Sequence, residues 1–429
     1  MLASLMAALK VPDLKKRITF LFGMLIVYVI GLHIPVPGVD TEVLRQRLSN
    51  GSDLLALFDV FTGGAFKKYA IFAMGIMPYI NASIIMQLLT MAVPQLEAMQ
   101  KEGAAGQKRI RLYTKWLTGV LAFFSAFGVT KWLQSVGAVN QGLGVMNIVF
   151  MSLILVAGTA FLMWMGEQIT EHGIGNGISI VIFAGIVATL PSQIFQTIQL
   201  EWLTNRNYVG VIIFALLFIA TIVFMVAVTQ AVRKIPIQHV KRVVGNKMVG
   251  GNSSYLPLKV NSAGVIPIIF AVSIMYFPMT VANFLSPGNS ESWISKFATF
   301  VAPGQSWFGS LLYAVLIIFF TYFYTAVSFN VKDVSENLKK YGSFIPGIRP
   351  GKPTQEYLDK VLTRITLAGA IFLAIVALLQ YYVPMLTNIR TFTLIGGTSL
   401  LIVVGVSLDT MQAIESHLLM RHYEGFIKK

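Results

Sequence analysis

Two apolar segments of this 429-residue chain nearly repeat each other, and a second pair of segments does the same. Residues 75–80 read GIMPYI and residues 264–269 read GVIPII, while residues 177–185 read GISIVIFAG and residues 397–405 read GTSLLIVVG. Both alignments place an isoleucine opposite an isoleucine. Apolar side chains offer an ion no ligands, and a narrow apolar constriction excludes water. A ring of isoleucines would therefore seal a conduit against ions, yet it could deform around a bulky object.

Polar residues follow the first isoleucines at helical spacing. One helical face carries, in order, Ile76, Ile80, Ser83 and Gln87. Asn81 lies beside this face, and Ile269 shares a face with Ser273 in the matching segment. A lipid-facing surface would not carry such a cluster, whereas a cavity open to water would. Packing between membrane helices is the alternative, because small and polar residues are common there, but the repeated placement on four segments favours a pore.

Residues that could catalyse a reaction or hold a metal are missing from the sequence. The chain has no cysteine, and none of its five histidines has an H-x-x-x-H partner. It has no G-x-x-x-x-G-K-[ST] loop for a nucleotide. Lys131, Glu167 and Asp409 lie toward the ends of apolar runs, whereas ion-coupled carriers use charges near the midplane. We therefore expect no catalytic residue, no metal site and no cofactor.

The apolar runs that position these residues are long and numerous. The chain is 55% hydrophobic and 12% charged, with a mean hydropathy of +0.71. Runs of about 18 or more apolar residues are candidate membrane spans. About ten such runs begin near Ile18, Tyr69, Trp116, Asn147, Ile174, Tyr208, Val260, Phe308, Ile365 and Thr391. The first run is long enough to be a span, so we do not expect a cleavable signal peptide.

The repeated segments divide these spans into two halves. Span two matches span seven and span five matches span ten, so the offset is five spans in both cases. An odd number of spans per half gives inverted topology about an axis in the membrane plane. We predict an all-α integral membrane protein of about ten transmembrane helices in two inverted, pseudo-symmetric halves, residues 1–200 with spans one to five and residues 201–429 with spans six to ten.

The net charge of +15 is unevenly distributed over the loops. With the N-terminus inside, 25 of the 33 Lys and Arg residues fall on the cytoplasmic side and 8 fall outside, which places both termini in the cytoplasm by the positive-inside rule. Direct DNA binding is not expected, because the charges lie between spans. Anionic lipid or a negatively charged cytosolic partner fits them better.

Two cytoplasmic loops carry much of this charge. Loop 232–259 has six basic residues, no acidic residue and several glycines, which suggests a protruding hairpin. Loop 330–362 holds Arg349 between two Pro-Gly turns, which would present the arginine on a stiff turn. The alternative for both loops is that their charge only sets the topology.

The first external loop contains a short amphipathic pattern. Apolar residues at helical spacing are Leu54, Leu57, Phe58 and Phe61. Gly63 and Gly64 would end this helix, which lies near residues 54–65 and is too short to span a membrane. The helix could lie on the outer leaflet or fold back into the protein as a re-entrant segment. The pattern alone favours the membrane surface.

Six motifs in the chain resemble those of the bacterial SecY family, the channel subunits of the Sec protein-translocation machine. They are FTGGA at 61–65, GIMPYINASIIMQLL at 75–89, GEQITEHGIGNGIS at 166–179, LPLKVNSAGVIP at 256–267, FIPGIRPG at 344–351 and GGTSLLI at 396–402. The resemblance runs from the first span to the tenth. It implies a channel that passes unfolded polypeptide across the membrane and releases apolar segments sideways into lipid.

The resemblance also implies roles for residues that match these motifs. The pore ring would be Ile76, Ile80, Ile178, Ile182, Ile269 and Ile402. A lateral gate would lie between spans two and three and spans seven and eight, with gate or vestibule residues Asn81, Ser83, Gln87 and Ser273. The plug of the resting pore would include Leu54, Leu57, Phe58, Phe61, Gly63 and Gly64. Residues for motor or ribosome docking would be Arg233, Lys234, Lys241, Arg242, Lys247 and Arg349.

The same resemblance implies partners and a location. The partners would be SecE-like and SecG-like small membrane subunits, the motor ATPase SecA, the ribosome, and the translocating polypeptide with its signal sequence. The location would be the bacterial cytoplasmic (inner) membrane. An inverted-repeat secondary transporter for a small solute is the alternative, although an apolar midplane offers no polar substrate site. A membrane insertase without a through-pore is a third hypothesis, against which the ring and the plug-like segment argue.

Overall fold

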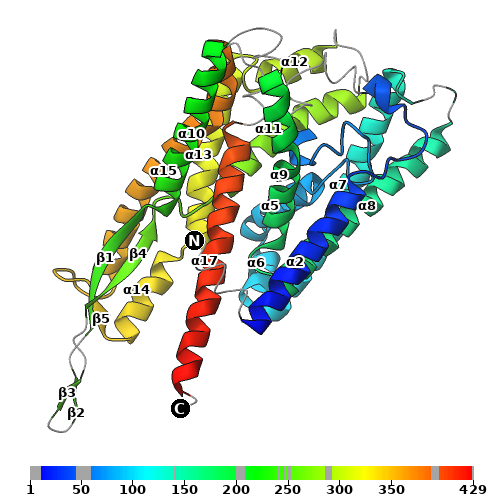
Figure 1. Ribbon diagram of the computed structural model, residues 1–429. Coiled ribbons are helices and arrows are strands. Elements are labelled where there is room, and N and C mark those ends of the chain that lie inside the picture. The colour runs from blue at the N-terminus through cyan, green and yellow to red at the C-terminus, as the bar shows by residue number, and fades with distance from the viewer. Residues whose placement is uncertain are drawn as a thin grey trace.

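The computed structural model describes residues 11–44, 59–139, 142, 144–199, 208–239, 242–244, 247–249, 253–285, 292–387 and 396–427. These residues form a bundle of long helices with a small β region beyond one end (Figure 1). The helices at the predicted spans are α2 (Pro12–Gly31), α5 (Met77–Ala92), α7 (Ala104–Ser135), α8 (Val145–His172), α9 (Gly177–Ile198), α10 (Tyr208–Gln230), α11 (Ile266–Leu285), α13 (Trp307–Ser328), α15 (Lys352–Thr387) and α17 (Thr398–Ile427).

Length and hydropathy support membrane spanning for most of these helices. Within the described residues, 7 helices are long and apolar enough by themselves, namely α7, α8, α9, α10, α13, α15 and α17. Helices α5 and α6 (Pro94–Lys101) meet the same criteria only as a bent pair, which gives up to 8 spans if the pair counts as one, and α11 contains a shorter apolar helix at Ile266–Met275. The prediction of an all-α membrane protein of about ten spans is confirmed.

The second span begins later than the hydropathy predicts. The apolar run starts near Tyr69, but residues 62–76 form turns, and α5 starts only at Met77. Gly75 has a φ of +55°, and Pro78 lies in the first turn of the helix, where its missing N–H costs no hydrogen bond. At the other end, Val93 is extended before a proline, and the chain bends by 99° into α6.

The β region joins the two basic loops. Strand β1 (Val232–His239) pairs antiparallel with β4 (Ser253–Lys259) on one side and with β5 (Ser343–Phe344) on the other. Strands β2 (Arg242–Val244) and β3 (Lys247–Val249) pair near the tip, farthest from the helices (Figure 1). The predicted protruding hairpin of loop 232–259 is confirmed. The pairing with β5, which comes from loop 330–362 beside α14 (Val331–Lys340), has no signal in the sequence pattern.

The four repeated segments meet in one buried cluster. Side chains from all four segments pack there, among them Ile80, Ile182, Ile268 and Ile402. Helix α11 packs against both α5 and α7, and α9 packs against α17. Glycines permit the closest contacts: a Cβ on Gly158 of α8 would lie 1.9 Å from the carbonyl oxygen of Ile71. The segments that the sequence repeats therefore contribute to one shared buried core.

Candidate functional site

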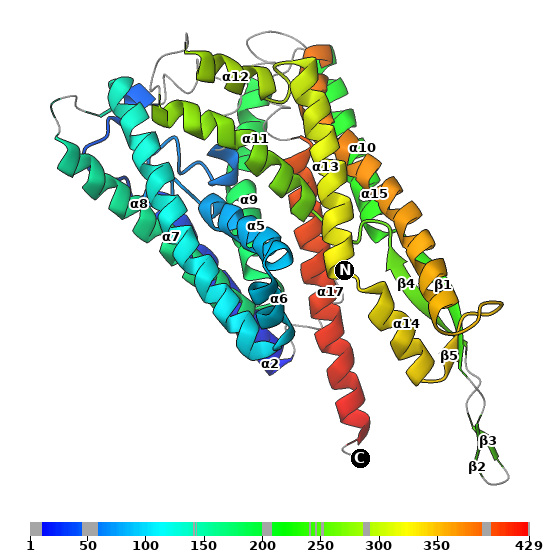
Figure 2. The same cartoon turned by 180° about the vertical axis from the view of Figure 1, so that it is seen from behind.

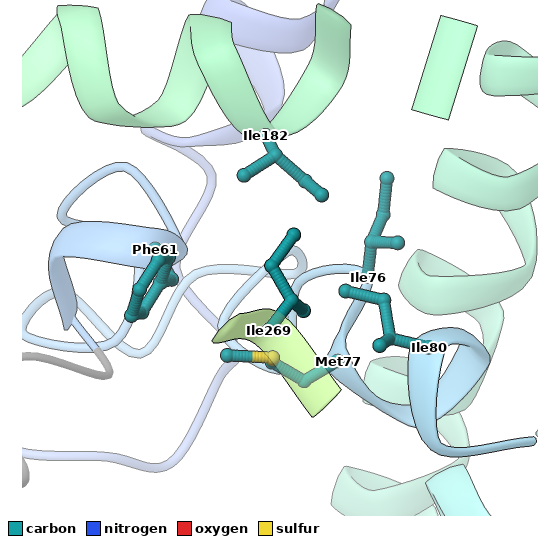
Figure 3. A pocket seen from close by; sticks show the side chains of 6 residues that line it. All are labelled: Phe61, Ile76, Met77, Ile80, Ile182 and Ile269. Carbon is teal, nitrogen blue, oxygen red and sulfur yellow. The ribbon is translucent and has the colours of Figure 1, made fainter. Parts of the chain in front are cut away.

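The turn before α5 positions the first two isoleucines. The carbonyl of Ile76 accepts hydrogen bonds from the N–H groups of Tyr79 at 3.0 Å and Ile80 at 3.1 Å, so the helix starts at this residue. A Cβ on Gly75 would lie 3.1 Å from the Cγ2 of Thr62, which shows that the turn is closely packed. Ile76 and Ile80 are both buried and lie one helical turn apart, facing the space between the helices (Figure 3).

Six apolar side chains line a small cavity between α5, α9 and α11 (Figure 3). They are Phe61, Ile76, Met77, Ile80, Ile182 and Ile269. The space open to the centre of a water molecule is about 10 Å³, close to the smallest volume that holds one water. None of these six side chains carries a charge or a hydroxyl that could replace the hydration of an ion. Such an apolar lining offers an ion or a water molecule no hydrogen-bonding partner, which is the property that a seal against ions requires.

Two of the predicted ring isoleucines do not belong to this cavity wall. Ile402 is buried in the surrounding core of α17. Ile178 lies in the first turn of α9, where its Cγ1 would be 3.1 Å from a Cβ on Gly166 of α8. Met77 and Phe61 complete the wall instead. Four of the six ring isoleucines are therefore brought together, while a pore role for Ile178 and Ile402 stays a prediction.

Residues 59–69 fold back into the bundle. Val60, Ala65, Phe66 and Tyr69 are fully buried, so the placement on the outer leaflet that the pattern favoured is wrong for these residues. The buried side chains of this segment contact protein and not lipid. Helical spacing of apolar residues does not determine which of the two they contact. Of the predicted plug residues, Leu54, Leu57 and Phe58 lie outside the described residues.

The predicted end of this short helix is confirmed. The N–H of Gly63 donates to the carbonyl of Val60 at 3.1 Å, and the N–H of Gly64 donates to the carbonyl of Asp59 at 2.8 Å. This pair of hydrogen bonds is a Schellman termination, which requires a left-handed residue after the helix. Gly63 has a φ of +72° and supplies that conformation. The chain then turns back toward α5.

A contact between two glycines places this segment beside the cavity. A Cβ on Gly63 would lie 3.1 Å from the Cα of Gly185 in α9. A Cβ on Gly185 would lie 2.8 Å from the hydroxyl oxygen of Tyr28 and 3.1 Å from the carbonyl oxygen of Phe61. Only a glycine, which has no side chain, lets the backbone of segment 59–69 approach helix α9 so closely. The ring of Phe61 consequently reaches the cavity wall (Figure 3).

Asp59 and Lys67 close this segment into a loop. The Asp59 side chain is 3% exposed, its Oδ1 accepts the N–H of Lys67 at 2.8 Å, and its Oδ2 lies 3.4 Å from the Lys67 Nζ. Burial raises the pKa of Asp59, because the loss of hydration outweighs the attraction of Lys67. Sequence reasoning missed this pair. An acidic residue on an otherwise apolar helix, with two lysines eight and nine positions later, was the available signal.

The polar residues of α5 share a face, as predicted. The Nε2 of Gln87 donates to the Oγ of Ser83 at 3.3 Å, and both residues are half-buried, as is Asn81. Ser273 of α11 is 7% exposed, and among the described residues its Oγ has no hydrogen-bond partner. A buried hydroxyl without a partner costs about 1–3 kcal/mol. Because α11 packs against α5 and α7, the two sides of the predicted gate are in contact, and the gate roles of these residues stay a prediction.

The basic docking residues lie at the end of the bundle that carries the β region. Arg233 and Lys234 are exposed on β1, Arg242 belongs to β2 and Lys247 to β3. Lys241 lies outside the described residues. The other four residues, Arg233, Lys234, Arg242 and Lys247, thus lie on strands of the same loop, and their role in docking remains a prediction.

Arg349 is exposed on the turn that precedes α15. Gly347 and Gly351 have φ values of +82° and +102°, as the two Pro-Gly signals predict. The hydroxyl of Thr354 donates to the Arg349 carbonyl at 2.8 Å, and the hydroxyl of Ser335 donates to the Gly351 carbonyl at 2.9 Å. These bonds hold the turn against α14 and α15, so the predicted turn is confirmed, while its stiffness stays a prediction.

His239 links the two basic loops through side chains. Its Nδ1 lies 2.8 Å from the Oγ of Ser343 on β5, and its Nε2 lies 3.1 Å from the Oγ of Ser254 on β4. Together with the strand pairing, these hydrogen bonds make loops 232–259 and 330–362 one surface. In the described ranges, no three or more His, Asp or Glu side chains converge as metal ligands.

Comparisons with known sequences bear on this arrangement. The family model of SecY matches residues 70–411. The protein translocase subunit SecY of Pseudomonas aeruginosa is 46% identical over 422 residues, which cover 97% of this chain and 94% of that protein. The SecY subunit of Halalkalibacterium halodurans is 47% identical over 432 residues, covering 98% of each chain. The SecY subunit of Thermotoga maritima is 45% identical over 433 residues, covering 98% of this chain and 97% of that protein.

Solved structures share the fold at lower identity. A protein-conducting channel superposes with a TM-score of 0.64 at 18% identity, covering 94% of this chain and 92% of the channel. Sec61 in a canine ribosome–channel complex superposes with a TM-score of 0.60 at 16% identity, again covering 94% and 92% of the two chains. The family model matches residues 70–411, and relatives are more than 40% identical over nearly the full length. The chain therefore belongs to the SecY family.

Proposed function

We propose that the chain is the protein-conducting channel subunit of a bacterial Sec translocase. It passes unfolded polypeptide across the membrane and releases apolar segments laterally into the bilayer. The observation that carries this proposal is the apolar constriction of Figure 3, closed by side chains from three helices and by Phe61. Relatives named protein translocase subunit SecY support the same function. A solute transporter fits less well, because none of the six described side chains that line the cavity is polar and could bind a small polar substrate.

We infer the residue roles from the sequence motifs, with support from the geometry for those side chains that line the cavity. Ile76, Ile80, Ile182 and Ile269 form the seal, with Ile178 and Ile402 as further ring members. The segment around residues 59–69 is the plug that stoppers the resting pore. Asn81, Ser83, Gln87 and Ser273 line the gate or vestibule where α11 meets α5 and α7. The two halves, residues 1–200 and 201–429, are related by inverted topology. The chain itself is a channel subunit without catalytic residues or cofactors.

Partners and location complete the proposal. The exposed basic residues of loops 232–259 and 330–362 dock a SecA-like motor or the ribosome on the cytoplasmic side, and they also suit anionic lipid. The Sec61 relative was solved in a ribosome–channel complex, which supports the ribosome as one partner. SecE-like and SecG-like subunits lie beside the bundle. The protein resides in the bacterial cytoplasmic membrane with both termini in the cytoplasm.

Crosslinking to an arrested chain tests the pore. The sequence has no cysteine, so a thiol introduced at Ile80 or Ile269 is the only one that reacts. Both variants should crosslink to a polypeptide stalled during translocation. Ile375→Cys on α15 is the matched control, because Ile375 is exposed on the outside of the bundle and should not crosslink. Absence of crosslinks at both pore positions, or equal crosslinking at Ile375, would contradict the proposed path.

A further inference from the structure

A short helix crosses the end of the bundle opposite the β region. Helix α12 (Trp293–Val301) has 9 residues, far too few to span a membrane. Figures 1 and 2 both show α12 lying crosswise to α13, at the end of the bundle far from the β strands. In the proposed topology this is the external end. The helix packs against α11 and α13, the two helices on one side of the proposed lateral gate.

The residues of α12 divide its surface into three faces. Ala298 and Val301 are buried against the bundle. Aromatic residues at positions i, i+4 and i+7 form a second face that is exposed, namely Trp293, Phe297 and Phe300. A third face is polar and consists of Ser295, Lys296 and Thr299. A helix that touches protein, carries an aromatic stripe and keeps a polar side has the composition of a helix at a membrane interface.

The aromatic face of α12 continues into the outer surface of α13. The ring of Phe300 stacks on that of Phe308 with centroids 5.2 Å apart and an interplanar angle of 14°. Trp307, beside Phe308, is 76% exposed. Along α13 the exposed residues at helical spacing are Leu311, Val315 and Phe319. Because α13 is long and apolar enough to span, this stripe faces hydrocarbon, and the aromatic patch of α12 is contiguous with it.

We propose that α12 lies in the outer-leaflet interface, with the rings of Trp293, Phe297 and Phe300 inserted among the lipids. Tryptophan favours this depth because its ring is apolar while its N–H can reach the headgroups. Lys296, at the edge of the aromatic face, lies where its ammonium reaches the lipid phosphates. The occupant is lipid because the patch continues the hydrocarbon-facing stripe of α13. The contact ties the external ends of α11 and α13 to the membrane surface.

Spin labels on adjacent faces of α12 test this proposal. Phe297→Cys and Thr299→Cys carry a nitroxide in the full chain, with its co-purifying subunits, in vesicles of phosphatidylcholine and phosphatidylglycerol. Since the chain has no native cysteine, each label occupies a single position. The label at 297 should be accessible to oxygen, shielded from a water-soluble nickel chelate, and about 5–10 Å below the headgroup level. The label at 299 should be accessible to the chelate.

Two results would overturn the proposal. Access of the nickel chelate to position 297 would put the aromatic face in water. Shielding of position 297 from both oxygen and nickel would mean that a partner subunit or a second copy covers it. If Phe297→Cys does not reach the membrane, Trp293→Cys and Ser295→Cys make the same comparison on the same two faces. A difference between the faces also shows that α12 is helical in the bilayer.

Discussion

Substitution of Gly185 should loosen the seal of the resting channel. Gly185 faces the buried segment 59–69, and an added Cβ would lie 2.8 Å from the Tyr28 hydroxyl and 3.1 Å from the Phe61 carbonyl. The Phe61 carbonyl is backbone and cannot rotate away as a flexible side chain could. Gly185→Ala therefore pushes the segment away from α9 or strains it in place. The contact with the Tyr28 hydroxyl of α2 is present in both states, whereas the contact with the Phe61 carbonyl exists only while the segment is seated, so this second clash destabilises the closed state selectively.

The magnitude follows from the size of the clash. Inserting one methyl group into a packed core costs about 1–3 kcal/mol. Alanine favours the helix more than glycine does, but this gain is the same for the seated and the unseated state, because α9 is helical in both. It therefore does not change the ratio of the two states. A cost of about 1–3 kcal/mol on one of two states shifts their ratio by about 5- to 150-fold. The fraction of resting channels with an unseated segment should rise by that factor until it saturates.

Ion efflux from vesicles that contain the purified channel measures this fraction. Gly119→Ala on α7 is the matched control, because a Cβ there meets nothing within 4 Å. Gly405→Ala, at the position that the sequence repeat pairs with Gly185, meets only a Val265 side-chain atom at 3.1 Å. Efflux should rise strongly for Gly185→Ala and little for the two controls. Unchanged efflux for Gly185→Ala, or an equal rise for Gly119→Ala, would refute the idea that segment 59–69 closes the pore against α9.

Three further predictions concern the segment, the gate and the docking surface. Burial raises the pKa of Asp59 above its ordinary 3.8, so the seated segment binds the proton more tightly than the unseated segment does. Ion efflux should therefore increase as pH rises through the raised pKa and level off above it. Asp59→Asn should abolish this pH dependence, and an unaltered efflux profile would contradict the role of Asp59. Ser273→Ala removes a buried hydroxyl that has no partner among the described residues, which should favour the closed gate by about 1–3 kcal/mol. Export of a substrate with a weakly apolar signal sequence should therefore fall. Ser262→Ala is the control and should leave export unchanged, because the Ser262 hydroxyl is exposed and donates to the Lys259 carbonyl. Arg349→Glu should impair translocation with normal membrane insertion, while Lys352→Glu, an exposed charge three residues away, should have a small effect; equal losses would indicate that only total charge matters.

The parts of the site that repeat or alternate in a regular way could be predicted from the sequence. Ile80, Ile182 and Ile269 were identified because two similar segments place isoleucines at matching positions, and helical spacing put Ser83 and Gln87 on one face. Met77 could not be identified, because its place in the cavity depends on where the turn before α5 ends. That end is set by packing of Gly75 against Thr62, which leaves no periodic trace.

Other features depend on tertiary contacts. The amphipathic pattern near residues 54–65 shows that one face is apolar but not whether that face meets lipid or protein. The Asp59–Lys67 pair spans eight residues and follows neither helical nor strand periodicity. Strand β5 has only 2 residues, and its pairing with β1 joins positions about a hundred residues apart. Such contacts are specified by the whole fold, so no local window of sequence contains them.

The three-stranded sheet of β4, β1 and β5 is joined through one short turn to a long helix. The turn at Arg349 leads directly into α15, whose 36 residues extend for about 54 Å at the usual rise of 1.5 Å per residue. Helix α15 packs along α13. At that length, each degree of tilt imposed at the sheet displaces the far end of the helix by about 1 Å. A tilt of a few degrees imposed where the two loops meet would therefore move the far end of α15 by several ångströms.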